Sequence, residues 1–399
     1  MKIDVFCEVE KARPWGPGHE YQLMKETLAQ AELADQVGFD CWWQVEHHTA
    51  EEMSYSSAPD IMLSAIAQRT KRIRVGHSAV LAPHNFAHPI RIAERAATLD
   101  LLSDGRLEMG FARSTTPEWR VFQIPPEDTK AQLQETLRMV PKMWTTDRFT
   151  YKSDRFEIND RPIIPKPLQK PHPPMWMAAG SPDSFVVAGQ NGIGVLGVTI
   201  FTPIDAMAGL IRTYREAIKD ARPAGSFINN QAGVFTFVHC AETTKKAIEN
   251  GAAEAAAWYC NTIVKFFELQ EMMKSVAETG VPSAPGQANE TAGAGLVAPI
   301  AAPASNAPAD PNQAAALELV AKLARNEQVS GEEVYEVLNT QDSVIIGDPE
   351  TCRKKMERYR DIGCDRLLCF QQVGALSHDA IMESTRLVGR HLIPQFSPK

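Results

Sequence analysis

The 399-residue sequence lacks the features that mark several large classes of protein. It has no block of lysine and arginine, and its formal net charge is −8, so neither nucleic acid nor an anionic membrane is an expected partner. No apolar run is long enough to span a bilayer. Residues 1–6 mix charged and apolar side chains, which is not the pattern of a signal peptide. We therefore expect a cytoplasmic protein with no membrane segment.

The seven cysteines form no Cys-x-x-Cys pair, and most of them lie within apolar stretches. This placement is typical of reduced thiols in the core of a cytoplasmic protein. The sequence also lacks the Gly-x-Ser-x-Gly elbow of many serine hydrolases, and no Gly-x-Gly-x-x-Gly motif follows its first apolar run. A serine hydrolase is therefore poorly supported.

The sequence does contain a regular alternation of short apolar runs with stretches of helical periodicity. Strands are expected at residues 3–9, 41–45, 73–79, 106–111, 175–179, 193–197, 233–240 and 365–371. Helices are expected at residues 20–37, 59–70, 89–102, 130–144, 205–219, 243–276 and 377–392, and another begins at Pro182. Eight repeats favour a closed (β/α)8 TIM barrel of the α/β class. An open doubly wound sheet is the alternative, weakened by the missing glycine motif.

Two segments interrupt this alternation. Residues 149–174 are rich in proline and short alternating stretches, so we expect a small hairpin outside the barrel. Residues 281–311 are mostly alanine, proline, glycine and small polar residues, which bury too little apolar surface to be ordered on their own. This segment is either a linker or a mobile active-site lid, and we favour the lid because it joins no two domains. Residues 1–399 are expected to form a single domain.

Polar side chains recur just past the expected ends of strands two to five. In a TIM barrel these ends share one face, which carries the active site. His47 and His48 are adjacent, so on a strand they point to opposite faces, and no third ligand accompanies Glu46 and His48. We therefore expect no metal site. The residues at the four strand ends are Glu46, His47 and His48, then Ser78 with Ala79, then Arg113, then Ser181.

Ser181 and Ser184 flank Pro182 at an expected helix start, where hydroxyls and unpaired backbone N–H groups suit a phosphate. Arg113, one strand away, can donate two hydrogen bonds to the same anion. Taken singly, Ser181 is explained as an ordinary helix cap and Arg113 as half of an ion pair. Together they predict a phosphate-bearing cofactor.

At these residues the chain resembles the bacterial luciferase family of flavin-dependent monooxygenases, over nearly its whole length. The resemblance implies a barrel that binds FMN, which a separate NAD(P)H:flavin reductase reduces. The matching stretches are residues 38–40 with 46–48, 75–80, 88–91 with 93–94, 104–106 with 110–113, 120–122, 179–181 and 258–259.

The resemblance also implies roles for individual residues. Arg113 and Ser181 match the positions that hold the flavin phosphate, assisted by Ser184 and the backbone near Thr115. Ser78 and Ala79 match a non-proline cis peptide under the isoalloxazine ring, and His47 matches the catalytic histidine. Glu46 is expected beside the cofactor as well, and residues 281–311 fall where luciferase carries its mobile loop. Two positions depart from luciferase itself, which has a reactive cysteine at Ala112 and a glutamate at Gly180.

The predicted function is a two-component monooxygenase. Reduced FMN would react with O2 to give a flavin 4a-hydroperoxide, which transfers one oxygen atom to an organic substrate. The protein is expected to be a homodimer. Two alternatives remain: an oxidoreductase that transfers hydride with the deazaflavin coenzyme, and a non-catalytic flavin-binding subunit.

Overall fold

A computed structural model describes residues 1–200, 203–268 and 327–396, together with residues 312, 315–316, 318–319, 322 and 325. The expected lid, residues 281–311, lies outside the described residues.

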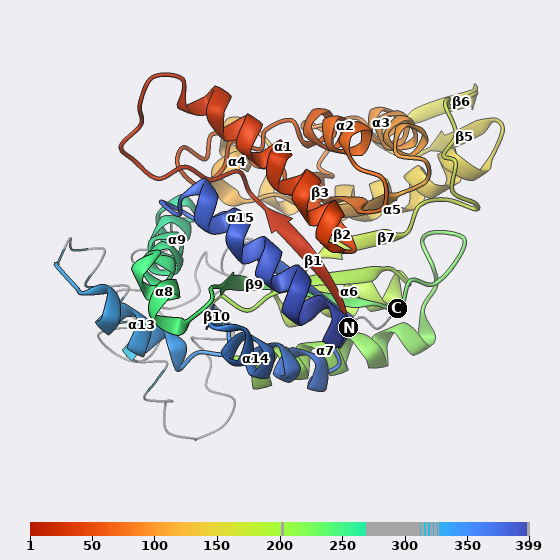
Figure 1. Cartoon of the computed structure of the whole chain (residues 1–399). Coiled ribbons are helices and arrows are strands. Elements are labelled where there is room, and N and C mark those ends of the chain that lie inside the picture. Colours follow the sequence, from red (N-terminus) through yellow and green to blue (C-terminus); the bar gives the residue numbers. More distant parts are fainter. Residues whose placement is uncertain are drawn as a thin grey trace.

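Eight parallel strands form a closed barrel, as the sequence predicts (Figure 1). Each strand pairs with its neighbour in parallel, and the pairing of the sixth with the seventh closes the ring. The closed ring excludes the open doubly wound sheet. The barrel strands are β1 (Lys2–Cys7), β2 (Cys41–Gln44), β3 (Arg74–Leu81), β4 (Leu107–Ala112), β7 (Met175–Ala178), β8 (Gly194–Val198), β9 (Ala232–Cys240) and β11 (Arg366–Phe370).

Helices cover the outside of the barrel, and Figure 1 shows the first and one of the last of them, α1 and α15, side by side along β1. Several of these helices begin with proline in the first turn, where its missing N–H costs no hydrogen bond. The covering helices are α1 (His19–Val37), α2 (Pro59–Arg69), α3 (Pro89–Leu102), α5 (Thr129–Thr145), α6 (Pro182–Gln190), α7 (Ile204–Ala217), α14 (Pro349–Asp361), α15 (His378–Leu387) and α16 (Ile393–Phe396).

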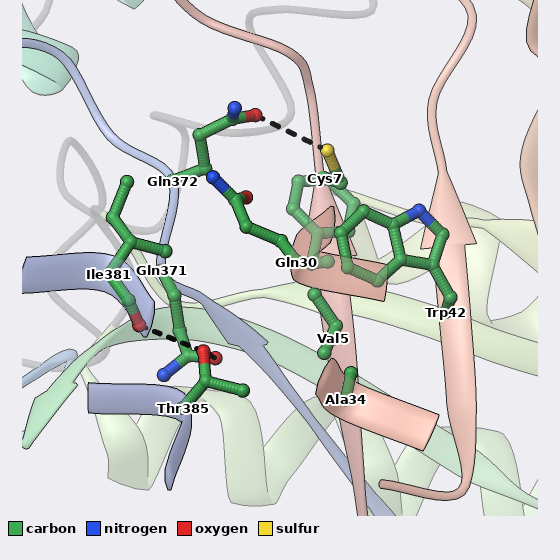
Figure 2. Close-up of a pocket in the computed structure, with 10 residues that line it drawn as sticks. Val5, Cys7, Gln30, Ala34, Trp42, Gln371, Gln372, Ile381 and Thr385 are labelled. Carbon is green, nitrogen blue, oxygen red and sulfur yellow. Dashed lines mark hydrogen bonds between the residues drawn. The ribbon is translucent and has the colours of Figure 1, made fainter. Parts of the chain in front are cut away.

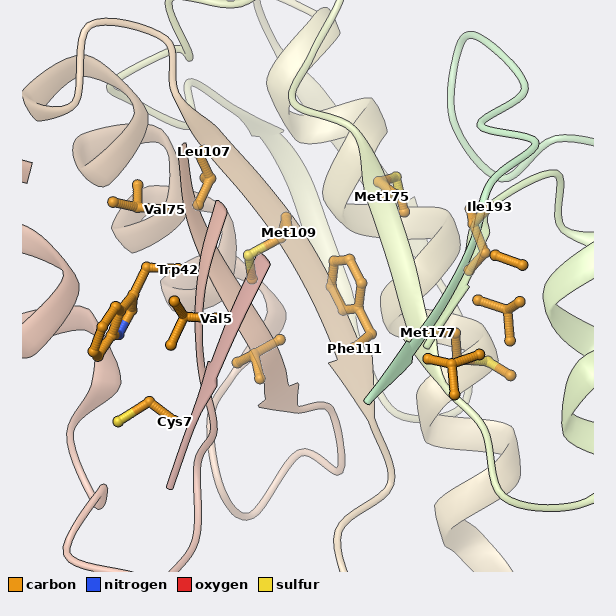
Figure 3. Packing of buried hydrophobic residues seen from close by; sticks show 14 of the residues in the cluster. Val5, Cys7, Trp42, Val75, Leu107, Met109, Phe111, Met175, Met177 and Ile193 are labelled. Carbon is orange, nitrogen blue, oxygen red and sulfur yellow. The ribbon is translucent and has the colours of Figure 1, made fainter. Parts of the chain in front are cut away.

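Successive strand residues alternate between two apolar layers. The outer layer packs the barrel against the helices and includes Val5, Val75 and Met109 (Figure 3). The inner layer fills the barrel and is rich in aromatic rings. Those rings include Phe6, Trp43, Trp176, Phe237 and Phe370.

The expected hairpin is present as β5 (Phe149–Lys152) and β6 (Glu157–Arg161), paired antiparallel. The prediction of a single long helix at residues 243–276 is wrong for residues 243–268, which the structure describes. The segment is divided into α8 (Thr244–Glu249) and α9 (Ala252–Phe266) by Gly251, whose φ of 76° is left-handed and ends a helix.

The sequence reading also missed several short elements and one longer helix. β10 (Val344–Gly347) extends the sheet beside the last residues of β9, and α14 follows it. The remaining elements are α4 (Thr116–Val121), α13 (Gly331–Asn339), the 3-10 helices at Pro126–Asp128 and Ile218–Asp220, and the π-helix at Val388–Leu392. Within the described part of the chain, every helix is too short or too polar to cross a bilayer.

Candidate active site

The predicted site residues follow neighbouring strands of the barrel. β1, β2, β3, β4 and β7 are consecutive in the sheet, so the segments after them gather at its carboxyl end. Ser78 and Ala79 lie inside β3, which runs two residues beyond the expected end of this strand at residue 79. Their peptide bond is cis, as the resemblance implies, and the β3–β4 register shifts between His77 and Val80.

His47 follows β2 by three residues and is held at one ring nitrogen. Its Nδ1 lies 3.4 Å from Oε1 of Glu118, and its ring meets the edge of Phe266 on α9. Its backbone N–H donates to the carbonyl of Ser56. Among the described residues, none bonds Nε2. Glu118 therefore fixes the ring of His47 through Nδ1 and leaves Nε2 without a partner among the described residues.

Glu118, on the short helix α4, is the residue that positions His47. Its side chain is fully buried and accepts hydrogen bonds from Ser114 Oγ (2.6 Å), Thr115 Oγ1 (2.8 Å) and the backbone N–H of His48 (2.8 Å). Burial alone would raise the pKa of Glu118, but His47 and these donors lower it to about 2. Glu118 is therefore a carboxylate at neutral pH.

The carboxylate in turn changes the acid–base balance of His47. Burial lowers the pKa of an imidazole, but Glu118 first, and then Glu8 and Glu46, outweigh burial and raise the pKa of His47 above 6.5. The cationic form of His47 therefore persists to higher pH than that of a free imidazole. Sequence reasoning missed Glu118, although Thr115-Thr116-Pro117-Glu118 matches the Ser/Thr-x-x-Glu pattern of a helix start.

Two further carboxyls, Glu8 and Glu10, were also missed. They follow β1 and are only 3% and 2% exposed. Burial raises the pKa of Glu8 to about 7, partly offset by His47 and by a hydrogen bond with the hydroxyl of Tyr259 on α9. Glu10 accepts a hydrogen bond from the backbone N–H of Gly374. The signal in the sequence was the alternation along β1, since Asp4, Phe6 and Glu8 share its inner face.

Glu46 is occupied by protein groups. Its carboxylate accepts a hydrogen bond from the backbone N–H of Leu81 (3.2 Å) and lies 3.3 Å from His77 Nε2 and 3.5 Å from His48 Nε2. Burial would raise its pKa, but His48 and His77 lower it to about 2. Glu46 thus ties the end of β2 to the end of β3, just beyond the cis peptide.

His48 makes contacts different from those of His47. Its ring stacks on Phe86 and also contacts Phe122. Both histidines lie beside a carboxylate, but the ring of His48 is packed between two phenylalanine rings, so the structure supports a packing role for His48.

Arg113, directly after β4, is a partly buried cation. Its Nη1 donates to Thr129 Oγ1 (3.2 Å), and the guanidinium lies 5.5 Å from the ring centre of Trp119. Burial lowers its pKa, and among the described residues no carboxylate forms an ion pair with it. A guanidinium in this state suits an anionic group such as a phosphate.

Ser181 begins α6 beside Arg113's strand, since Phe111 of β4 pairs with Met177 of β7. Ser181 and Ser184 form a reciprocal capping box: the Ser184 N–H donates to Ser181 Oγ, and the Ser181 N–H donates to Ser184 Oγ (3.0 Å). The Ser184 hydroxyl in turn donates to the Ser181 carbonyl (2.6 Å). The helix cap is therefore real, and it occupies the hydroxyl proton of Ser184. Ser181 Oγ donates to Ser184 Oγ over a longer distance (3.2 Å), so its proton is the easier of the two to redirect to an anion.

A small cavity lies elsewhere, between β1 and the helices α1 and α15 (Figure 2). Its polar lining comes from Gln30, Gln371, Gln372 and Thr385, and Cys7 Sγ lies 3.4 Å from Oε1 of Gln372. Polar walls of this kind suit a buried water molecule. The cavity is on the helix side of β1 and does not belong to the candidate active site.

At its carboxyl end, this parallel barrel gathers a histidine, buried carboxylates and an arginine that has no carboxylate partner among the described residues. The arrangement defines a TIM-barrel protein with an enzyme-like site. Residues 1–366 match the family model of luciferase-like monooxygenases, and the chain belongs to that family.

Two curated relatives show the chemical range of this family. The oxygenase component of flavin-dependent trigonelline monooxygenase from Acinetobacter baylyi is 32% identical over 200 residues, which are 49% of this chain and 53% of the relative. The F420-dependent glucose-6-phosphate dehydrogenase of Amycolatopsis mediterranei is 31% identical over 182 residues, 43% of this chain and 53% of the relative. The chain thus spans about half the length of these relatives.

A solved structure shares the fold. The oxygenating constituent of 3,6-diketocamphane monooxygenase from Pseudomonas putida, a type II Baeyer-Villiger monooxygenase in complex with FMN, superposes with a TM-score of 0.69. The identity is 17%, and the match covers 99% of this chain and 98% of that chain.

Proposed function

We propose that the protein is the oxygenase component of a two-component monooxygenase that uses reduced FMN and O2 to oxygenate an organic substrate. One observation carries the cofactor assignment: the partly buried guanidinium of Arg113 lacks a carboxylate among the described residues and lies one strand from Ser181. A phosphate completes this arrangement as an ion pair with a hydrogen-bonded rim.

The roles of the chain's own residues follow from their contacts. Arg113 and Ser181 would bind the phosphate, with Ser184 holding the turn and the backbone near Thr115 beside it. Ser78 and Ala79 would support the ring system from β3. His47, held by Glu118, would give up or take back a proton at Nε2. Bound reduced FMN would supply the reaction with O2, and the protein would orient the substrate and exclude water.

The wider assignment includes a separate flavin reductase, since a relative is named as an oxygenase component. Homodimer formation and cytoplasmic location belong to the same proposal. The seven free, buried cysteines support a reducing compartment.

The second candidate is hydride transfer with the deazaflavin coenzyme, which the F420-dependent relative favours. An anaerobic titration separates the two. The protein is mixed with reduced FMN or with reduced F420 under nitrogen, and binding is followed by flavin absorbance and fluorescence.

Each complex is then exposed to O2. We expect tight binding of reduced FMN and an O2-dependent absorbance change that differs from free flavin oxidation. Preferential binding of F420, with no effect of O2, would replace the first candidate by the second.

A further inference from the structure

Glu8 and Glu10 form a buried pair that the proposed binding and His47 steps do not use. Oε2 of Glu8 and Oε1 of Glu10 have no hydrogen-bond partner within the described chain. Two ionised carboxylates with unpaired oxygens at this burial would be strongly unfavourable, because like charges repel and neither oxygen is solvated. A single proton on the pair supplies one donor and removes one charge.

The neighbours of the pair make His47 the partner for that proton. Burial raises the pKa of each nearby thiol and phenol, so these groups stay neutral near pH 7. His47, in contrast, forms a cation: it lowers the pKa of Glu8, and Glu8 raises the pKa of His47. The groups that act on the pair are Cys7 on β1, His47 after β2, Tyr259 and Cys260 on α9, and the backbone N–H of Gly374.

The strand geometry brings the pair and the histidine to the same end of the barrel. β1 and β2 are neighbours with Cys7 opposite Gln44, so Glu8 and His47 both lie just past that last pair. The loop after β2 also folds back onto β1, since Ser54 Oγ donates to the carbonyl of Glu8 (2.7 Å).

We propose that Glu8 and Glu10 together hold one proton at neutral pH and exchange it with the imidazole of His47, as the proton store of the site. In the exchange, the O–H bond of one carboxyl breaks and an N–H bond forms at Nε2 of His47. Nε2 is the acceptor because Glu118 holds Nδ1. Solvent later returns a proton to the pair. The use of this proton in turnover rests on the proposed function, whereas the shared proton does not.

The first test is infrared spectroscopy of the protein without cofactor, above pH 7. We expect the carbonyl stretch of a protonated carboxylic acid, lost or shifted in both Glu8→Gln and Glu10→Gln. Asp4, whose pKa burial raises to about 6, is mostly ionised under these conditions. Glu46→Gln is the matched control and should keep the band, because its pKa is about 2. A parent spectrum without the band, or variants that both retain it, would overturn the shared proton.

The second test follows the His47 ring by NMR of histidine-labelled protein across pH. Parent His47 should titrate in two coupled steps, and Glu8→Gln should leave a single step at lower pH. An unchanged titration curve in Glu8→Gln would contradict the exchange. Should Glu8→Gln fail to fold, Glu10→Gln gives the same test.

Neither measurement contains flavin, so both stand even if reduced FMN proves not to bind. If it does bind, the pH profile of turnover in Glu8→Gln should narrow on its alkaline side, because the store that reprotonates His47 is gone. An identical profile would limit the pair to a structural role.

Discussion

The amino-terminal and carboxyl-terminal ends of the barrel interior both bury charged side chains. At the amino-terminal end, Asp4 accepts hydrogen bonds from Arg366 Nη1 and from the indole of Trp43, both at 2.8 Å. Glu108 there accepts from Arg74 and from the indole of Trp176. At the carboxyl-terminal end, oxygens of the Glu8–Glu10 pair lack donors, and Arg113 lacks a carboxylate among the described residues.

The charged groups at the amino-terminal end are paired with one another and stabilise the barrel. Those at the carboxyl-terminal end, which we call the incomplete end, have atoms without a partner among the described residues. A buried ion pair whose hydrogen bonds are all formed offsets most of the free energy of removing its charges from water. A buried polar group without a partner destabilises the folded state by about 1–3 kcal/mol. The incomplete end therefore destabilises the folded protein when nothing is bound. Such a cost is typical of a functional site.

The largest effect should come from His47 at the incomplete end. We expect His47→Ala to reduce turnover by about 10²–10⁴-fold, the range for a general acid or base, with flavin affinity nearly unchanged. The assay is steady-state oxygenation with an external flavin reductase.

The matched control is His48→Ala, which removes a ring stacked on Phe86 and should lower stability more than rate. A rate loss confined to the His48 variant would reverse the roles of the two histidines.

The complete end should respond in stability. Arg366→Met leaves Asp4 and Glu108 buried without their shared cation, so we expect a loss of about 3–5 kcal/mol in the free energy of unfolding. Urea denaturation measures it. Arg386→Met, which breaks an exposed pair with Glu383, should cost less than about 1 kcal/mol. Equal losses of stability in Arg366→Met and Arg386→Met would show that the buried ion pairs of Arg366 stabilise the fold no more than an exposed ion pair does.

The sequence predicted the eight strands because apolar runs and their boundaries are local signals. It missed β10 (Val344–Gly347), a short strand that exists by pairing with the end of β9. The predicted helix at residues 243–276 also continued through Gly251, although the dipeptide Asn250-Gly251 commonly ends a helix.

Within the site, the strand-end residues could be found one by one, but their partners could not. Glu118 is 71 positions from His47, and only the fold brings the two side chains together. Arg366 and Asp4 are 362 positions apart, and their pairing could not be predicted from the sequence either. What a charge is paired with, and so whether it is structural or functional, is decided by tertiary contacts.

Substitution of Arg113, at the carboxyl-terminal end of the barrel, should affect ligand affinity and not stability. Because it has no carboxylate among the described residues, Arg113→Met should leave the free energy of unfolding nearly unchanged, unlike Arg366→Met. Reduced FMN affinity should fall by about 1.5–3 kcal/mol, the value of a hydrogen bond to a charged group. Anaerobic titration measures the affinity, and Arg120→Met, at an exposed pair with Glu268, is the control. Unaltered affinity in Arg113→Met would remove the phosphate assignment.

The smallest expected effect concerns the ion pair of Glu118 with His47 at the carboxyl-terminal end of the barrel. The pKa of His47 is raised in the folded protein, so its stabilising contribution is complete below 6.5 and is lost as the pH rises through the folded value. The pKa of Glu118 is lowered from 4.5 to about 2, so its contribution is complete above 4.5 and is lost as the pH falls toward 2.

The two windows overlap between pH 4.5 and 6.5. There, Glu118→Gln should be less stable than the parent by roughly 1–2 kcal/mol, because glutamine keeps the oxygen that Ser114 and Thr115 bind but loses the charge. The deficit should shrink on both sides of the window. Urea denaturation across pH measures it, with Glu135→Gln as a control that leaves His47 untouched. A deficit that grows steadily above neutral pH would mean that His47 is neutral beside Glu118, and the proton-donating role of the imidazole would then have to be abandoned.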